Sequence, residues 1–289
     1  MTVDYRRLSR KDFRLEMLLG LGRSSQVYLA KAPDGARVAL KVPRREVREN
    51  KHLADRFAQE VALSLTLSHP NLVKGLSGRP AGNGAFLALE YFPEGSLEDL
   101  IVQAPLPQAN AIECLKQLAS AVIFLHSQSI VHQDIKTSNV YLCSGTYKLG
   151  DLGVAKTRDN PRPLERAGSP FYMAPELFRG EPASPASDAY SLGVLAFELL
   201  TGKRPFRADT YEELSYAHLH NAPPATRLEK HLDEAVRGLM AKEPSSRWTV
   251  QQFLNALEGK PRVAKPSSSE EPKGKKLSLQ RLFSRRIKG

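Results

Sequence analysis

The sequence has few cysteines and no long hydrophobic run. These two features argue against a disulfide-stabilised protein and against a membrane-spanning one. Its two cysteines, Cys114 and Cys143, follow no metal-ligand spacing and would make a thin disulfide framework. Because both lie among apolar residues, we expect buried, reduced thiols. The most apolar stretch, at 193–200, contains Glu198 and is far too short to span a bilayer. No apolar segment follows the first residues, so we expect no secretory signal and a cytoplasmic protein.

The positive charge of the chain is concentrated near its C-terminal end. Residues 260–289 hold ten lysines and arginines against two glutamates, so they carry +8 of the formal net charge of +11. The rest of the chain is nearly balanced, which argues against a specific nucleic-acid-binding face there. With 41% hydrophobic residues overall, this part is long enough to bury a sizeable core in one or two domains.

Hydrophobic periodicity divides the chain into a β-rich part and a later α-rich part. Residues 13–42 alternate in the manner of strands and contain two hairpin-like connections, which predicts an antiparallel sheet. A buried strand is predicted over 84–92. Helical spacing of apolar residues or helical composition predicts helices over 51–67, 111–128, 187–201 and 232–242. We therefore expect an α+β protein in which a small β-rich lobe joins a larger helical lobe near Phe92.

The basic C-terminal segment has a different composition from the rest of the chain. From about residue 260 it is rich in proline, serine and charge, which is typical of a largely disordered linker. Residues 276–288 nevertheless place Leu279, Leu282, Phe283 and Ile287 on one helical face, which predicts a short amphipathic helix over 277–288. Two interpretations remain: a solubilising tail, or a weak, reversible contact with an anionic membrane surface or a partner.

Two features of the β-rich part could bind phosphate. In LGLGRSSQVYLA, Gly20 and Gly22 lack Cβ atoms, so the backbone can approach a polyphosphate and direct N–H groups at it. Turn glycines between hairpin strands would explain the same pattern. On the next strand, Lys41 in VALK lies among apolar residues and needs an anion, either a phosphate or a carboxylate such as Glu60. A purely structural Lys41–Glu60 ion pair remains an alternative.

The run VHQDIKTSNV at 131–140 contains a carboxylate, an amine and an amide at close spacing. Asp134 could orient a hydroxyl, and Lys136 could meet a phosphate. Asn139 and Asp151, the acid of KLGDLG, offer the hard oxygen ligands that suit Mg²⁺. Each acid alone would more often be a turn or helix-cap residue. Together with Lys41, in this order, they predict phosphoryl chemistry.

These motifs resemble the eukaryotic-like, Hanks-type protein kinase family over roughly 13–257. The family's Gly-rich loop, VAIK, HRDxKxxN, DFG and APE motifs are matched in order by GLGRSSQV, VALK, HQDIKTSN, DLG and APE. The segment YAHLHNAPPA at 216–225 resembles bacterial Ser/Thr kinases. The resemblance implies a bilobal kinase domain over 13–258, with an N-lobe at about 13–90 that carries one regulatory helix and a C-lobe at about 93–258. Residues 259–289 would form the tail.

The resemblance also implies an activity and the residues that perform it. Lys136 two residues after Asp134 is the pattern of Ser/Thr kinases, which use ATP with Mg²⁺ (or Mn²⁺) and phosphorylate protein substrates. Asp134 would accept the hydroxyl proton, and Lys136 would stabilise the transferring phosphoryl group. Asn139 and Asp151 would hold the metal. The nucleotide would be bound by Leu19, Gly20, Leu21, Gly22, Arg23, Ser24, Ser25, Gln26, Val27, Ala39, Lys41, Glu60, Leu89, Glu90 and Phe92. Glu176 would pair with Arg247, and Asp188 would anchor the catalytic loop backbone.

The sequence departs from the family pattern at three positions. Ser25 replaces the third glycine of the loop, and Leu152 replaces the Phe of DFG; neither change removes a charge. Gln133 replaces the Arg that usually receives an activation-loop phosphate through charge-assisted hydrogen bonds. Because a neutral Gln cannot form that clamp, we expect activity without strong dependence on phosphorylation between Asp151 and Glu176.

Two rival functions belong to other classes. A pseudokinase scaffold would bind partners through the same fold, but it would need none of the charged residues retained here. A surface or nucleic-acid adaptor would act through the basic tail, and deleting 260–289 would then abolish function while sparing phosphorylation of a generic substrate.

Overall fold

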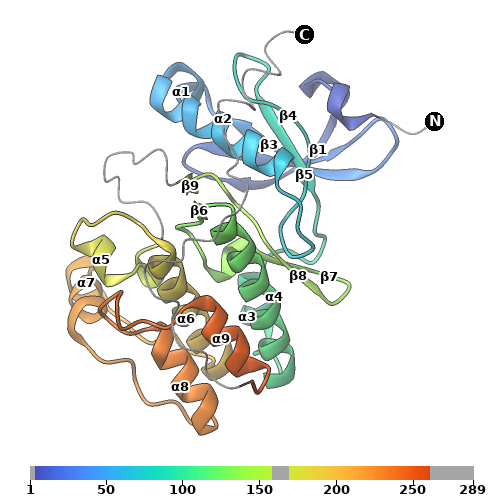
Figure 1. The fold of residues 1–289 in the computed structure, drawn as a ribbon. Helices are drawn as coiled ribbons and strands as arrows, with labels where there is room; N and C mark the ends of the chain where they lie inside the picture. Colours follow the sequence, from blue (N-terminus) through green and yellow to red (C-terminus); the bar gives the residue numbers. More distant parts are fainter. Residues whose placement is uncertain (1–3, 158–168, 261–289) are drawn as a thin grey trace. The chain divides into compact units, whose positions relative to one another are not determined.

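The chain folds into two compact units. A computed structural model describes residues 4–157 and 169–260 (Figure 1). One unit comprises the chain up to Glu94 together with Gly150–Gly153, and the other begins at Gly95 and resumes at Val154. The first is built on a sheet and the second mostly on helices, which confirms the expected α+β architecture of a β-rich N-terminal lobe and a helical C-terminal lobe.

The N-terminal unit is built on a five-stranded antiparallel sheet. Its strand order is β1-β2-β3-β5-β4. The bounds are Arg14–Leu21 for β1, Ser25–Lys31 for β2, Arg37–Pro43 for β3, Gly75–Arg79 for β4 and Phe86–Glu90 for β5. Gly35, in the β2–β3 turn, has φ +86°, a left-handed conformation that glycine adopts at little cost. The hairpins expected over 13–42 are therefore confirmed.

Alternation along β3 sends its residues to two different faces of the sheet. Val38, Leu40 and Val42 are buried in a cluster that includes Phe13 and Phe86. On the other face lie the helices α1, Arg45–Glu49, and α2, Lys51–Thr66. Leu87 packs there against apolar side chains of α2. Lys41, opposite Leu87 in the β3–β5 register, is thereby directed to the α2 face.

The C-terminal unit is organised around a buried central helix. The helices are α3 Leu97–Gln103, α4 Gln108–Ser127, α5 Pro175–Phe178, α6 Pro185–Thr201, α7 Tyr211–His220, α8 Lys230–Leu239 and α9 Val250–Leu257. Figure 1 shows α6 among α4, α8 and α9. Most of the α6 side chains are buried, as expected of a helix that is apolar on all sides. Helix α8 approaches closely at Gly193, where an added Cβ would lie 2.8 Å from the Leu239 Cβ.

Two short strand pairs complete the C-terminal unit. Strand β6, Ile130–Val131, pairs with β9, Lys156–Thr157, and β7, Val140–Cys143, pairs with β8, Thr146–Leu149. Both pairs are antiparallel. The β6–β9 pair fixes the start of the 131–140 segment and the residues just after Val154. The β7–β8 pair fixes the end of the 131–140 segment.

The four helices expected from the sequence are all present, with ends displaced by a few residues. Further helices were not predicted, among them α7. It begins at a capping box in which the Thr210 Oγ1 accepts a hydrogen bond from the Glu213 backbone N–H at 3.2 Å. That Thr-x-x-Glu pattern is visible in the sequence and is the signal that could have placed the helix.

The expectation for the cysteines is half wrong. Cys114, on α4, is a buried free thiol, and burial raises its pKa. Cys143 is also a free thiol but is exposed, because it ends β7 next to the turn at Ser144 and Gly145. Over residues 4–157 and 169–260, no helix combines the length and the hydropathy needed to cross a membrane.

A buried histidine gives the C-terminal unit a predictable response to acid. His218 packs against Phe178 and Phe206, and its Nδ1 lies 2.9 Å from the Tyr190 hydroxyl. Burial, with the nearby Lys242 charge, lowers its pKa from 6.5 to about 3. Between these two values the unfolded chain binds a proton that the folded chain does not, so stability falls as the pH drops below 6.5.

We therefore expect the thermal midpoint to fall between pH 7 and pH 5, and to fall less in His218→Asn, which cannot titrate. The loss that His218 accounts for is at most about 2 kcal/mol over this interval. The exposed His231 provides the matched control, because His231→Asn should keep the wild-type pH dependence. An unchanged pH dependence in His218→Asn would contradict the assignment. Thermal unfolding followed by circular dichroism measures both.

Candidate functional site

Two carboxylates of the N-terminal unit meet at the Lys41 amine. Its Nζ lies 2.5 Å from Glu60 Oε1 on α2 and 3.1 Å from Asp151 Oδ1. The Lys41 and Glu60 side chains are 12% and 5% exposed, whereas Asp151 is 41% exposed. Burial alone would lower the pKa of Lys41, but the charges of Asp151 and Glu60 outweigh burial and raise it. The amine is therefore a fixed cation at neutral pH.

This cluster brings together three of the residues singled out in the sequence. Glu60 was expected as the carboxylate partner of Lys41, and the structure contains that ion pair. Asp151 was expected as a metal ligand, and its contact with Lys41 was not predicted. An ion pair is available to Lys41 without any phosphate, so the pair by itself does not decide between a structural and a functional role.

Backbone geometry at DLG places the Asp151 carboxylate. Asp151 has φ 60°, a left-handed conformation that costs a non-glycine residue on the order of 1–2 kcal/mol. The Gly153 N–H donates to Asp151 Oδ1 at 3.2 Å. A Cβ at Gly153 would lie 3.0 Å from that oxygen and 3.1 Å from Glu60 Oε2, so the close approach favours glycine there. Strain of this kind concentrates at functional sites.

One face of the N-terminal sheet presents several of the expected nucleotide-binding residues. In the register, Val27 lies opposite Lys41, and Leu89 lies opposite Ala39. All four therefore point to the same face as Lys41, away from the Leu40 core. The hydrophobic residues flank the cation, which is an arrangement able to cover a flat apolar ring beside a bound anion.

The remaining expected nucleotide-binding residues surround this face within the N-terminal unit. Leu19, Gly20 and Leu21 end β1, and Gly22, Arg23 and Ser24 form the hairpin loop. The loop is closed by a hydrogen bond from the Gly22 N–H to the Ser25 carbonyl at 2.9 Å. Ser25 and Gln26 begin β2, Glu90 ends β5, and Phe92 follows it. The Glu90 N–H already donates to the Lys74 carbonyl at 3.0 Å.

In the C-terminal unit, two residues of the 131–140 segment and one backbone N–H from outside it converge on the Asp134 carboxylate. Lys136 Nζ lies 2.8 Å from Asp134 Oδ2, and Asn139 Nδ2 donates to the same oxygen at 2.9 Å. Asn139 Nδ2 also donates to the Asp134 carbonyl at 2.8 Å. The other carboxylate oxygen, Oδ1, accepts from the Ser169 backbone N–H at 3.0 Å. Asp134 is thus held in one orientation, with its side chain 12% exposed.

Ser169 contacts Asp134 through its main chain. The donor is its backbone N–H. The Asp134 carboxylate is therefore tied to the 169–172 segment by a backbone N–H, a group that every non-proline residue carries.

A buried aspartate holds the backbone of the same segment, as the resemblance implied. Asp188, in the first turn of α6, accepts from the His132 N–H and the Gln133 N–H, both at 2.8 Å. His126 Nε2 lies 2.9 Å from Asp188 Oδ2. The His126 contact was not predicted. Only its position one residue before the end of the long helix α4, near the start of the segment, hinted at it.

Gln133 has a partner that the sequence did not reveal. Its Nε2 donates to the Val154 carbonyl at 2.8 Å, and its backbone has φ 70°. The side chain therefore binds the chain just after DLG by a neutral hydrogen bond. This hydrogen bond connects the 131–140 segment directly to the segment that begins at Val154.

A second set of contacts, also missed from the sequence, links the segment to α6. Thr137 Oγ1 lies 3.0 Å from the Tyr172 hydroxyl, which also donates to Glu198 Oε2. Arg204 Nε donates to the second oxygen of Glu198 at 3.0 Å. Burial, together with the Glu198 charge, raises the pKa of Tyr172, so its hydroxyl stays protonated. These side chains are far apart in sequence, and no short motif contains them.

The residues expected to hold a metal have suitable donor atoms. Both hydrogen bonds of the Asn139 amide use Nδ2, which leaves Oδ1, an oxygen that can ligate a cation. Asp151 is a partly exposed carboxylate beside a cation that fixes its position. Amide and carboxylate oxygens are ligands that Mg²⁺ accepts, usually in small number and together with phosphate oxygens. Each residue, taken by itself, therefore offers a donor atom of the kind that a nucleotide-bound divalent cation accepts.

Comparison with known proteins matches this constellation to one family. The family model described as the protein kinase domain matches residues 13–257. That range includes all the positions discussed above.

Several curated proteins are similar over most of the chain. A serine/threonine-protein kinase of Corynebacterium efficiens is 33% identical over 251 residues, which is 82% of this chain and 48% of the relative. Serine/threonine-protein kinase PknB of Mycobacterium leprae is 31% identical over 260 residues, 84% of this chain and 42% of the relative. Serine/threonine-protein kinase ATG1a of Arabidopsis thaliana is 31% identical over 259 residues. The chain thus spans about half the length of the curated relatives that it matches.

Proposed function

This chain belongs to the protein kinase family, and on that premise we propose that it is a bacterial-type serine/threonine protein kinase. It transfers the γ-phosphoryl group of ATP to Ser or Thr hydroxyls of protein substrates and to its own. The observation that carries the proposal is the geometry at Asp134, whose carboxylate is held by Lys136, Asn139 and the Ser169 N–H. The similarity to curated serine/threonine kinases over more than 80% of the chain supports it.

In this proposal each residue at Asp134 has a separate task. Asp134 orients the substrate hydroxyl and accepts its proton as the phosphoryl group departs from ATP. Lys136, 2.8 Å from the carboxylate, supplies a positive charge beside the transferring group. Asn139 and the Ser169 N–H keep the carboxylate from rotating. Positioning and charge neutralisation account for most of the catalysis in phosphoryl transfer.

In the N-terminal unit, Lys41 binds the α- and β-phosphates, and Glu60 keeps its amine in place. Val27, Ala39 and Leu89 lie on the face of the sheet that would contact the adenine. Gly20 and Gly22 allow the loop backbone to approach the phosphates. Asn139 and Asp151 are the residues that would hold Mg²⁺, or Mn²⁺ in its place. When bound, this cation neutralises charge on the phosphate oxygens.

The direct test is incubation with labelled ATP, Mg²⁺ and a generic protein substrate, followed by acid hydrolysis. We expect labelled phosphoserine and phosphothreonine without phosphotyrosine. Lys41→Met should remove most of the incorporation, because it removes the cation that binds phosphate. Equal, negligible incorporation in wild type and variant would overturn the proposal and favour a pseudokinase scaffold, which no present observation supports. Deleting 260–289 tests the adaptor alternative. An adaptor that acts through the tail would lose its function, while phosphorylation of the generic substrate would be spared.

We propose further that Gln133 stands where most kinases carry the phosphate-binding Arg of HRD, and that activity therefore does not depend strongly on a phosphorylated activation loop. Gln133 already holds Val154 through its amide, without charge. A phosphate clamp uses charge-assisted hydrogen bonds worth about 1.5–3 kcal/mol, roughly tenfold to a hundredfold in activity. Gln133 has no positive charge to pair with a phosphate, and its Nε2 already donates to the Val154 carbonyl.

Thr157→Ala accordingly should change the initial rate on a generic substrate by less than about twofold. Rates are measured with wild type and with the exposed Thr66→Ala as control. A loss of tenfold or more in Thr157→Ala alone would show that the segment needs a phosphate after all. Ser169→Ala makes a second test, because the contact with Asp134 uses the Ser169 backbone N–H and survives the substitution.

The organisation around the kinase domain is also part of the proposal. The domain spans 13–258, and 259–289 forms a basic tail that can make a weak contact with an anionic membrane or a partner through residues 276–288. A cytoplasmic protein, peripheral at the membrane surface, would result. Residues 261–289, which include the expected helix over 277–288 and the serines of the tail, lie outside the residues that the structure describes.

A further inference from the structure

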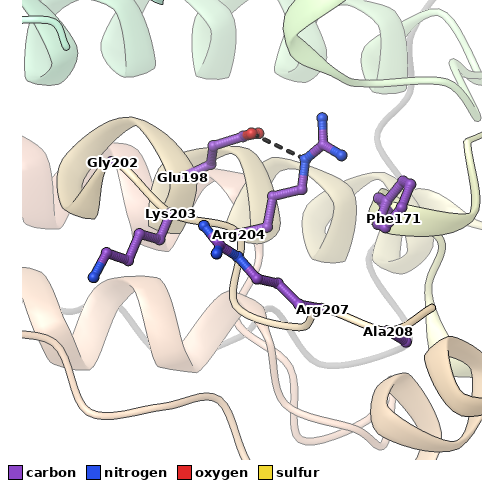
Figure 2. A pocket seen from close by; sticks show the side chains of 7 residues that line it. All are labelled: Phe171, Glu198, Gly202, Lys203, Arg204, Arg207 and Ala208. Atoms are coloured by element: carbon purple, nitrogen blue, oxygen red, sulfur yellow. Dashed lines mark hydrogen bonds and ion pairs between the residues drawn. The ribbon is translucent and has the colours of Figure 1, made fainter. Parts of the chain in front are cut away.

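A basic pocket lies in the C-terminal unit beside the 169–172 segment. It has a volume of about 300 Å³ and is lined by Phe171, Glu198, Gly202, Lys203, Arg204, Arg207 and Ala208 (Figure 2). The pocket lies at the end of α6 and the chain that follows it. A volume of this size is at the lower end of ligand pockets and can hold one charged side chain.

The only acidic side chain of the lining is already neutralised. Arg204 Nε donates to Glu198 Oε1 at 3.0 Å, and the Tyr172 hydroxyl donates to Oε2. Figure 2 shows the Arg204 head turned toward Glu198. Arg204 also lies 3.5 Å from Glu98 and stacks 4.6 Å from the Phe171 ring centroid. Both oxygens of Glu198 are therefore occupied, so a basic ligand would find little attraction there.

Two further cations of the lining have no such partner. Lys203 and Arg207 are exposed, and neither forms an ion pair within the described part of the chain. In Figure 2 the Lys203 head points away from Glu198. The acid nearest to Arg207 in the sequence is Asp209. It is not part of the pocket lining and forms no ion pair with Lys203 or Arg207 within the described part of the chain. The unneutralised charge of the pocket is therefore positive.

The pocket is tied to the catalytic residues within the same unit. Its Phe171 wall belongs to the segment whose Ser169 N–H holds Asp134, and Tyr172 of the same segment bonds Thr137 at 3.0 Å, one residue after Lys136. A polypeptide whose hydroxyl reaches Asp134 must therefore pass this segment. We propose that the pocket is a specificity site that takes an anionic side chain of the protein substrate, a carboxylate or a phosphoryl group, through Lys203 and Arg207.

This inference rests on the proposed kinase function but can fail separately from it. The probes are peptides with one Ser acceptor in a neutral background, in which Glu, phosphoserine or Arg occupies each flanking position in turn. The variant is Lys203→Glu/Arg207→Glu. The matched control is Arg227→Glu/Lys230→Glu, which reverses the same two residue types at exposed positions of the same unit.

We expect wild type to phosphorylate the best Glu peptide with a kcat/KM about tenfold above that of the matched Arg peptide, as two partly exposed ion pairs provide. Lys203→Glu/Arg207→Glu should abolish or reverse this preference by raising the KM for the acidic peptide. The control should behave as wild type. A preference that survives in the variant, or is lost equally in the control, overturns the proposal. Phosphoserine peptides distinguish a phosphoryl group from a carboxylate.

Binding is also measured without catalysis. Fluorescence anisotropy follows labelled peptides in which Ala replaces the acceptor Ser, at constant ionic strength. Tighter binding of the acidic peptide that depends on Lys203 and Arg207 supports the pocket, even if wild type transfers no phosphate and the kinase proposal fails. Equal binding of the Glu, Arg and neutral peptides overturns the pocket, even if the enzyme is active.

Discussion

Asp134→Asn lowers kcat for phosphoryl transfer by about 10²- to 10⁴-fold, the usual contribution of a positioned proton acceptor. Asn has nearly the same shape as Asp, and its single amide oxygen can still accept from the Ser169 N–H. Its NH2 group replaces the oxygen that faces Lys136, and the neutral amide cannot take the substrate proton. Because binding of ATP does not need that carboxylate, the KM for ATP should change little. The initial rate with labelled ATP measures the effect.

The control for Asp134→Asn makes the same chemical change at the surface. Asp55 pairs with Lys51 at 3.3 Å and is 53% exposed, so Asp55→Asn should leave the rate unaltered. The thermal midpoint of each variant is measured beside the rate, to show that the fold persists. If Asp134→Asn keeps the wild-type rate, the residue is not the proton acceptor and the mechanism proposed here is wrong.

Glu176→Ala destabilises the C-terminal unit by about 3–5 kcal/mol, because it leaves a buried guanidinium without its counter-charge. Arg247 and Glu176 are 0% and 2% exposed and form a bidentate pair at 2.7 and 2.9 Å. The other donors of Arg247 reach the carbonyls of Ala186, Ala241 and Lys242. A loss of this size is a large fraction of the stability of an ordinary domain.

Urea unfolding measures this loss, and a nearby pair gives the comparison. Arg179 and Glu181 lie 2.6 Å apart at the surface, so Glu181→Ala should cost at most about 1 kcal/mol. The double variant Glu176→Leu/Arg247→Met should recover part of the loss, because it removes both charges from the interior. If Glu176→Ala costs no more than Glu181→Ala, the pair contributes nothing beyond a surface contact.

The sequence alone reached the fold class and the principal elements for physical reasons that are local. Alternation over 13–42 marked strands, and helical spacing over 51–67 marked α2, which covers one face of the sheet. The Lys41–Glu60 and Glu176–Arg247 pairs could be expected because buried charges need partners and the motif order implied which ones. Cys143 shows the limit of this reasoning. Apolar neighbours predicted burial, but its place at the end of β7 exposes it.

The sequence by itself determined which residue types are available for phosphoryl chemistry and in what order they occur. Only the tertiary structure decided how they are held: Gln133 on the Val154 carbonyl, His126 on Asp188, and Tyr172 between Thr137 and Glu198. The tertiary structure also decided that Glu198 is neutralised while Lys203 and Arg207 are not, and this makes the net charge of the pocket positive. These contacts join segments that lie far apart along the chain. Periodicity and motif spacing report only on neighbouring residues, so they cannot predict which distant side chains will meet.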